Sequence, residues 1–394
     1  MAAPPVTTLP RELSAADEQL IAASNRFGLS LFREVEGTTR DTLPNLFLSP
    51  LSVTMALGML YTGAAGETEA AMRRTLEFEG LAPDEVNRSY RGLIQMLRGL
   101  DPGVHFSLGN SLWCRQGISF TRSFLEASRT YFDARVEALD FSDPAAAGLI
   151  NDWVRRATEG RIADIVSAPL PPLAWMYLLN AIYFKGDWTA QFDPALTHSG
   201  RFRRADGSTT TVRMMSHPEP IGVRVTGDDN PLIVDLPYGG RAFSMTIALP
   251  RDPSGISSLV AGLTAERWNT WMGGLQRDMC EVRLPTFKLE NDLILNGALR
   301  ALGMGIAFEP GKADFGPMRP ERDVHVTEMR HKSYVDVNEE GTEAAAVTSV
   351  MLVGFGGFHP VRRVVVDRPF VFAIRDKLSG TILFVGRVLD PAAE

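Results

Sequence analysis

Cysteine is scarce in this chain of 394 residues, since Cys114 and Cys280 are the only two and lie far apart. Metal sites built on cysteine need several Cys or His residues at short spacings, and no CxxC pair occurs. The sequence therefore predicts no metal site and no bound cofactor. Both cysteines lie in apolar, strand-like segments, so we expect buried free thiols, with one disulfide as the alternative.

Long apolar runs and an excess of positive charge are also missing. No stretch of 18 apolar residues occurs, so we expect no membrane-spanning helix. Residues 1–9 lack the basic start and apolar run of a signal peptide, which leaves the compartment open. The net charge of −7 argues against a nucleic-acid partner. The short basic group of Arg201, Arg203, Arg204 and Arg213 is interpreted as solvated surface.

Charge is absent from one conspicuous segment, because residues 344–358 contain no Asp, Glu, Lys or Arg. Residues 344–353 contain no Gly or Pro either. A small, uncharged, β-competent segment of this kind would pair readily with another strand if it were exposed. It is therefore either a permanent core strand or a strand kept available for addition to a sheet.

The rest of the chain is patterned for helices in its first half and for strands in its second. Apolar spacing predicts helices at 12–35, 52–61, 68–76, 120–132 and 145–157, with a strand at 106–114. Strands are expected at 176–184, 211–225, 232–250, 280–290, 324–338 and 361–386, with one helix at 291–303. No repeat or linker-like stretch divides the chain, which favours one α+β unit.

Six motifs follow one another along the chain. They are NLFLSPLSVTMALGMLYTGAAGETEAAM (45–72), INDWVRRATEGRIADIV (150–166), LLNAIYFKGDW (178–188), LPTFKLENDLILNGALRALGM (284–304), HKSYVDVNEEGTEAAAVT (331–348) and RPFVFAIRDKLSGTILFVGRVLDP (368–391). This ordered series resembles the serpin family of protease inhibitors, and the match covers roughly residues 20–391. The resemblance implies three β-sheets, eight or nine helices and an exposed reactive-centre loop at about 340–362. We expect a flexible N-terminal extension at 1–15 and a serpin domain at 16–394.

The resemblance makes the uncharged segment an insertable loop, whose hinge comprises Glu339, Glu340, Gly341, Thr342, Glu343, Ala344, Ala345, Ala346, Val347 and Thr348. A strand alternates its faces, and every even position from Thr342 to Leu352 is uncharged and small or apolar. This face can be buried without stranding a charge. Gly341 is expected at the turn where the inserted strand would fold back on residues 332–339.

Counting from the hinge glycine, as the resemblance implies, places the scissile bond between Phe355 and Gly356. Gly354, Gly356 and Gly357 would let the backbone adapt to a protease cleft. A Phe at the cut site suits the hydrophobic pocket of a chymotrypsin-like protease. Because the segment 355–369 is longer than in typical relatives, Phe358, Leu352 and Met351 stay open as cut sites.

The implied activity is suicide inhibition by a monomer that has no catalytic residue of its own. The target protease cleaves the loop, the loop inserts into the main sheet, and the acyl-enzyme is trapped. Two alternatives stay open, namely a non-inhibitory carrier or chaperone, and an inhibitor of a subtilisin-like or cysteine protease. Such a function favours an extracellular or periplasmic location.

The resemblance also assigns supporting residues. Ser49, Ser52, Asn180 and His331 match a buried polar cluster, the shutter, where the sheet must part. A catalytic base is the alternative role for His331, although no nucleophile is arranged around it. Trp188 matches the breach, the region near the place where the sheet opens to admit the loop. Glu339 matches a glutamate that usually pairs with a lysine. That position is Thr286 here, so Lys288 is the nearest candidate partner.

Overall fold

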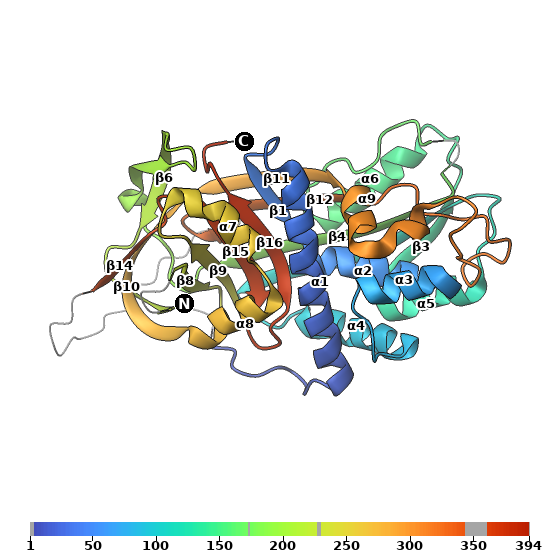
Figure 1. Cartoon of the computed structure of the whole chain (residues 1–394), viewed down its shortest axis with the longest axis horizontal. Helices are drawn as coiled ribbons and strands as arrows, with labels where there is room; N and C mark the ends of the chain where they lie inside the picture. Colours follow the sequence, from blue (N-terminus) through green and yellow to red (C-terminus); the bar gives the residue numbers. More distant parts are fainter. Residues whose placement is uncertain (1–3, 172–173, 227–229, 343–360, 394) are drawn as a thin grey trace.

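The computed structural model describes residues 4–171, 174–226, 230–342 and 361–393, and Figure 1 shows the whole molecule. The described residues contain nine α-helices, which pack mostly around one end of the sheets. The helices are α1 (Ala15–Thr39), α2 (Pro50–Tyr61), α3 (Gly66–Thr75), α4 (Pro83–Leu97), α5 (Arg122–Phe132), α6 (Ala146–Ala157), α7 (Ile256–Ala261), α8 (Ala265–Gly274) and α9 (Asn296–Leu299).

The strands of the described residues form one sheet of ten strands and one of six. They are β1 (Asn45–Leu48), β2 (Val104–Arg115), β3 (Ala134–Leu139), β4 (Met176–Asp187), β5 (His198–Arg203), β6 (Thr209–Ser216), β7 (Ile221–Val225), β8 (Leu232–Pro237), β9 (Phe243–Leu249), β10 (Gln276–Pro285), β11 (Phe287–Ile294), β12 (Arg330–Val337), β13 (Gly341–Thr342), β14 (Arg362–Val365), β15 (Phe370–Asp376) and β16 (Ile382–Val388). The α+β class is confirmed.

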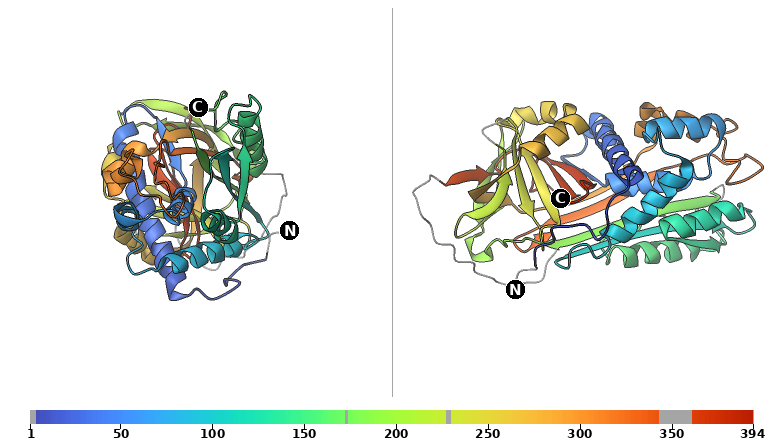
Figure 2. Two further views of the ribbon diagram at one scale, coloured as in Figure 1. Left: turned by 90° about the vertical axis from the view of Figure 1, so that its right-hand side faces the viewer. Right: turned by 90° about the horizontal axis from the view of Figure 1, so that it is seen from below.

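The six-stranded sheet has the order β11-β12-β13-β4-β2-β3. Its long strands run along the molecule, as the right-hand view of Figure 2 shows. The two-residue strand β13 lies between β12 and β4 and is antiparallel to both. The strands β12 and β4 are therefore parallel to each other, and they flank the position of one intervening strand.

The ten-stranded sheet has the order β1-β16-β15-β9-β8-β7-β10-β6-β5, with β14 added on β10. We expected three separate sheets from the resemblance, whereas hydrogen bonding joins the described strands into two. The reason is that β10 pairs with β7 over residues 276–280 and with β6 over residues 283–285. One long strand thus connects two groups of strands.

Two apolar clusters hold these layers together. The larger one includes α2, whose twelve residues are all buried because the helix is apolar on every side. The smaller one joins α6 to β2, β3 and β4 through residues such as Trp113, Leu139, Ile150 and Leu179. The strands on one side of β13 therefore pack on α6 through this smaller cluster, and they also contribute residues such as Leu112 and Phe184 to the larger one.

Several sequence-based element predictions need correction. The helix expected at 291–303 is wrong at its start, because β11 extends to Ile294 and α9 begins at Asn296. The reason is visible in β11, where Phe287, Leu289, Asn291 and Leu293 alternate with exposed residues, which is the period of a strand. The helices α4, α7 and α8 were not predicted. Within the described ranges no helix is long and apolar enough to cross a membrane.

Candidate strand-insertion site

The chain reverses direction between β12 and β13, at the start of the expected hinge. The Asn338 side-chain oxygen accepts hydrogen bonds from the backbone N–H groups of Glu340 and Gly341, at 3.1 and 3.3 Å. The backbone N–H of Asn338 donates to the Gly341 carbonyl at 2.9 Å. This tight turn directs the next residues into the position between β12 and β4.

Gly341 is required here by close packing. A Cβ atom at this residue would lie 2.1 Å from the carbonyl oxygen of Gly186 and 2.7 Å from the Cα of Asp187, both on β4. The φ of Gly341 is not in the left-handed region. The expected glycine is thus explained by the nearness of the β4 backbone, whereas turn conformation was the reason given from the sequence.

Thr342 is the last described residue before the gap, and it is 1% exposed. Its hydroxyl lies 2.8 Å from the phenol oxygen of Tyr238. This inward orientation is the one expected for even-numbered positions of the hinge. The predicted hinge residues from Glu343 to Thr348 lie outside the described residues, as do the candidate cut sites Phe355, Gly356, Phe358, Leu352 and Met351.

Trp188 closes the turn from the β4 side. Its indole N–H donates to the carbonyl of Asn338 at 2.9 Å, and its ring stacks on Tyr238 with centroids 4.4 Å apart. Its backbone N–H donates to the Glu340 carbonyl at 2.9 Å. Tyr238 is fully buried and was not identified from the sequence. Burial raises the pKa of its phenol, so it stays protonated and available to Thr342.

The ion partner of Glu339 is Arg213 on β6, with a guanidinium nitrogen 3.0 Å from the carboxylate. The proposal of Lys288 is therefore wrong, since the Lys288 ammonium lies over the Tyr334 ring instead. The expected lysine position, Thr286, donates its backbone N–H to the carbonyl of Arg213 at 2.9 Å. Arg213 of the adjacent strand β6 thus pairs with Glu339, where the resemblance implied a lysine at position 286.

Three of the four expected shutter residues form one hydrogen-bonded group. The Ser49 side chain accepts from the backbone N–H of Ser52 at 3.1 Å and donates to the Leu383 carbonyl at 2.6 Å. The Ser49 backbone N–H donates to His331 Nε2 at 3.0 Å, so the ring accepts at that nitrogen. Burial lowers the His331 pKa to about 4, although nearby Asp292 partly opposes this shift.

The fourth residue, Asn180, lies on β4 and binds a different partner. Its amide nitrogen donates to the Asn110 side chain on β2, which in turn donates to the Phe132 carbonyl at 2.6 Å. Among the described residues its own side-chain oxygen has no hydrogen-bond partner. The polar groups of the shutter are thus divided between the two sides of the opening.

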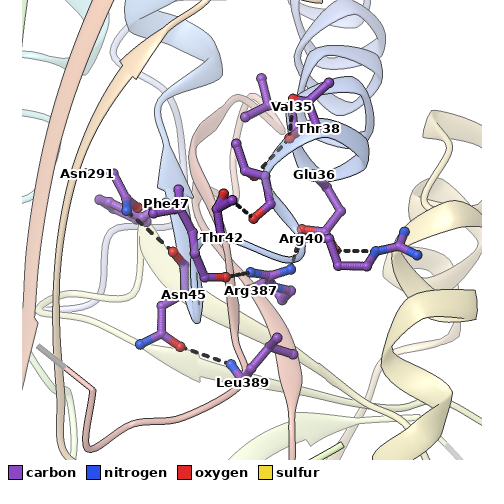
Figure 3. Close-up of polar contacts among 12 residues, drawn as sticks. Val35, Glu36, Thr38, Arg40, Thr42, Asn45, Phe47, Asn291, Arg387 and Leu389 are labelled. Carbon is purple, nitrogen blue, oxygen red and sulfur yellow. Dashed lines mark hydrogen bonds and ion pairs between the residues drawn. The ribbon is translucent and has the colours of Figure 1, made fainter.

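Two further polar residues, Asn291 and Ser333, anchor β1 and were missed in the sequence. The Phe47 backbone N–H donates to the Asn291 side chain at 2.6 Å, as Figure 3 shows, and the Ser333 hydroxyl donates to the Phe47 carbonyl at 2.7 Å. The sequence did contain a signal for Ser333. Ser333 and His331 alternate along β12 with the same period as Val335 and Val337, so all four lie on its buried face. Polar residues at core parity indicate a buried polar network.

The two cysteines are both buried and free, as expected. Burial raises the pKa of each thiol to about 11, so neither is a reactive thiolate near neutral pH. No group of three or more His, Cys, Asp or Glu side chains able to hold a metal occurs in the described part of the chain.

The chain is similar to known proteins in both sequence and structure. The family model described as Serpin (serine protease inhibitor) matches residues 22–391. Leukocyte elastase inhibitor of Bos taurus is 36% identical over 383 residues, which is 95% of this chain and 100% of that protein. The native structure of a thermophilic serpin, tengpin, has a TM-score of 0.85 at 27% identity and covers 99% of this chain and 97% of its own. Human thyroxine-binding globulin has a TM-score of 0.85 at 26% identity, over 96% of this chain and 100% of its own.

Proposed function

Because this chain belongs to the serpin family, we propose that it inhibits a chymotrypsin-like serine protease as a suicide substrate. The name of a relative, leukocyte elastase inhibitor, supports protease inhibition. The observation that carries the proposal is β13, the two-residue start of a strand between the parallel strands β12 and β4. Among the described residues, β12 and β4 each pair with β13 and not with one another.

The register of β13 defines where an inserted strand would continue. Thr342 pairs with Val337 on one side and with Gly186 on the other, in antiparallel order. Each step of two residues along the loop therefore moves two residues back along both neighbours. Residue 344 would lie between Val335 and Phe184, residue 346 between Ser333 and Ile182, and residue 348 between His331 and Asn180.

This register suits the chemistry of the loop. The neighbours Val335, Phe184 and Ile182 are buried, so Ala344 and Ala346 would enter an apolar layer. Thr348 would reach the shutter, where the Asn180 oxygen has no partner among the described residues. A threonine hydroxyl can donate there, which would satisfy a buried acceptor in the inserted state.

The two sides of the opening have partly different anchors. Asn291 and Ser333 fix β11 and β12 to β1, which is part of the ten-stranded sheet, and His331 binds the N–H of Ser49 at the start of α2. The strands β2, β3 and β4 share a smaller apolar cluster with α6. Because β4 and β12 both also contribute to the larger cluster, parting them would move their inner faces over that core.

In the proposed reaction the nucleophile belongs to the protease. Its serine oxygen would bond to the carbonyl carbon of Phe355, and the bond to the nitrogen of Gly356 would break, which leaves an acyl-enzyme and a free amine. The part of the loop that ends at Phe355 would still be bound to the protease, and it would then be free to insert into the sheet as a strand. Each new ladder hydrogen bond contributes about 0.5–1.5 kcal/mol, so ten of them would contribute about 5–15 kcal/mol before strain and ordering of the loop are subtracted.

The first test is to mix the chain with chymotrypsin and examine the products by denaturing electrophoresis and mass spectrometry. We expect a covalent complex that survives denaturation, together with a released fragment that begins at Gly356. Clean cleavage without a complex would contradict inhibition and favour a carrier. Trypsin, subtilisin and a papain-like protease serve as the comparison panel, and faster association with one of these would correct the assigned target class.

A further inference from the structure

A cleft of about 710 Å³ lies on the ten-stranded sheet, and none of its lining residues belongs to β13. Its walls come from β7, β8, the start of β10 and the turns after β8 and β15. In Figure 1, β8 and β10 lie at the same end of the molecule as β14. A volume of this size is typical of small-molecule sites, which usually measure about 300–1,000 Å³.

Four cationic side chains converge on this cleft from four different segments: Arg224, Arg241, Arg277 and Lys377. Across the described parts of the chain, none of the four forms an ion pair. Two carboxylates also line the cleft, Asp278 at its exposed side and the buried Asp235. Asp235 is already matched by Arg375, whose guanidinium lies 3.1 Å away, so the cleft carries excess positive charge.

Two of these cations are held together by the sheet itself. Arg224 on β7 and Arg277 on β10 are directly opposite partners in the antiparallel register. Like charges at directly opposite positions repel each other and destabilise a sheet. Arg224 donates to the Leu275 carbonyl at 3.1 Å, and on its other side it is directly opposite Asp235 of β8, whose Oδ1 is bound by Arg375. An anion between the two guanidinium groups would reduce the repulsion between Arg224 and Arg277.

The pKa of Lys377 shows the same crowding. Burial lowers it, the nearby carboxylate of Asp235 raises it, and Arg375, Arg224 and Arg241 each lower it by a smaller amount. The positive charges of the cleft are thus close enough to act on one another. A bound anion would favour the charged form of Lys377.

Asp235 adds a hydrogen-bond acceptor to this cationic surface. Its Oδ1 accepts from the hydroxyls of Ser244 and Thr246, at 2.8 and 2.6 Å, and from Arg375. Its Oδ2 is buried and has no partner among the described residues, while the residue as a whole is 1% exposed. Buried oxygens are normally hydrogen-bonded, so this one indicates a place for a ligand's hydroxyl or amino group.

We propose that this cleft binds a small organic anion that also carries a hydroxyl or amino donor. The carboxylate or phosphate of the ligand lies between Arg224 and Arg277, and its donor reaches Asp235. Leu275 and Met279 supply apolar contact for the carbon skeleton. The proposal concerns a site apart from β13 and does not depend on protease inhibition.

The test is calorimetric titration of the intact, uncleaved chain with citrate and with glucose 6-phosphate, which separate carboxylate from phosphate recognition. We expect saturable binding of at least one of them, at one site per chain and with a Kd below about 1 mM. The double variant Arg224→Gln/Arg277→Gln should weaken this binding at least tenfold. Its urea unfolding midpoint is measured alongside, which shows that the variant is folded at the temperature of the titration.

The matched control is Arg88→Gln/Arg201→Gln, which removes the same charge from exposed positions elsewhere and should bind as the unmodified chain does. Equal loss in both double variants would show general charge attraction and overturn the proposal, as would no binding of either anion at 10 mM. Tricarballylate, which is citrate without its hydroxyl, should bind several-fold more weakly. Equal affinity of these two would overturn the role given to Asp235.

Discussion

At the scale of single residues, Gly341 shows how a small side chain can be required by its neighbours. The backbone of β4 passes so close that a methyl group would contact the Gly186 oxygen at 2.1 Å. Either the turn at 338–341 or the end of β4 would have to move. Overpacking of this kind costs about 1–3 kcal/mol.

We therefore predict that Gly341→Ala lowers the stability of the uncleaved chain by about 1–3 kcal/mol, measured as the midpoint of urea unfolding. The control is Gly297→Ala in α9, where no atom lies within 4 Å of the added methyl and alanine favours the helix. An unchanged midpoint for Gly341→Ala would show that the turn adapts without cost.

His331 is a second residue with a measurable signature. Its folded pKa of about 4 lies below the unfolded value of 6.5, because burial disfavours the charged ring. The unfolded chain therefore binds the proton more tightly. The stability that depends on a neutral His331 is complete above pH 6.5 and is lost as the pH falls toward 4, by about 3 kcal/mol in total.

We predict that His331→Asn reduces the loss of stability between pH 7 and pH 5, measured as the change in urea midpoint. His198→Asn, at an exposed position, should leave that loss unchanged. His217 is also buried, with a pKa lowered to about 4 by burial, so part of the acid sensitivity should persist in His331→Asn. Identical pH dependence in all three proteins would contradict this account of His331.

At the scale of elements, the parity of the loop decides whether a strand can be added. Thr342 faces inward, and in the proposed register an inserted strand would continue this face through residues 344 and 346. A charge on this face would have to be buried without a partner, which costs several kcal/mol. A charge on the opposite face would not meet this penalty.

The matched pair Ala346→Arg and Ala345→Arg separates the two faces, because only the parity differs. We predict that Ala346→Arg converts the inhibitor into a substrate, with at least a tenfold increase in the molar ratio needed to inhibit chymotrypsin fully. Ala345→Arg should stay near the unmodified ratio. If the two variants behave alike, the register proposed from β13 is wrong.

At the scale of the whole molecule, the proposed inhibitor stores stability that only cleavage releases. The uncleaved state would then be kinetically trapped, and the cleaved state would gain a full strand in the six-stranded sheet. A gain of about 10 kcal/mol from ten ladder bonds corresponds to a rise of roughly 10 °C or more in Tm for a chain of this size.

We predict that the chain nicked at the loop by a protease that it does not trap melts at least about 10 °C above the intact chain, in the same buffer. Nicked Ala346→Arg should show a much smaller rise, which makes it the control for cleavage alone. A nicked wild-type chain with an unchanged Tm would exclude insertion, whatever the result of the inhibition assay.

The sequence by itself determined the family and the chemistry of the loop. The ordered motifs, the uncharged run after Glu343 and the even-numbered face from Thr342 onward are local patterns, which can be read because a strand has a period of two residues. The single α+β fold could be predicted for the same reason. The boundary between β11 and α9 could not, because short apolar runs fit a strand and a helix equally.

Only the tertiary structure decided which distant residues meet. Arg213 reaches Glu339 from β6, Tyr238 binds Thr342, and the β4 backbone excludes any side chain at residue 341. The division of the shutter between His331 and Asn180 likewise depends on which strands are neighbours. These contacts join residues 70 or more positions apart, and no periodic pattern within one segment carries information about its partners in space.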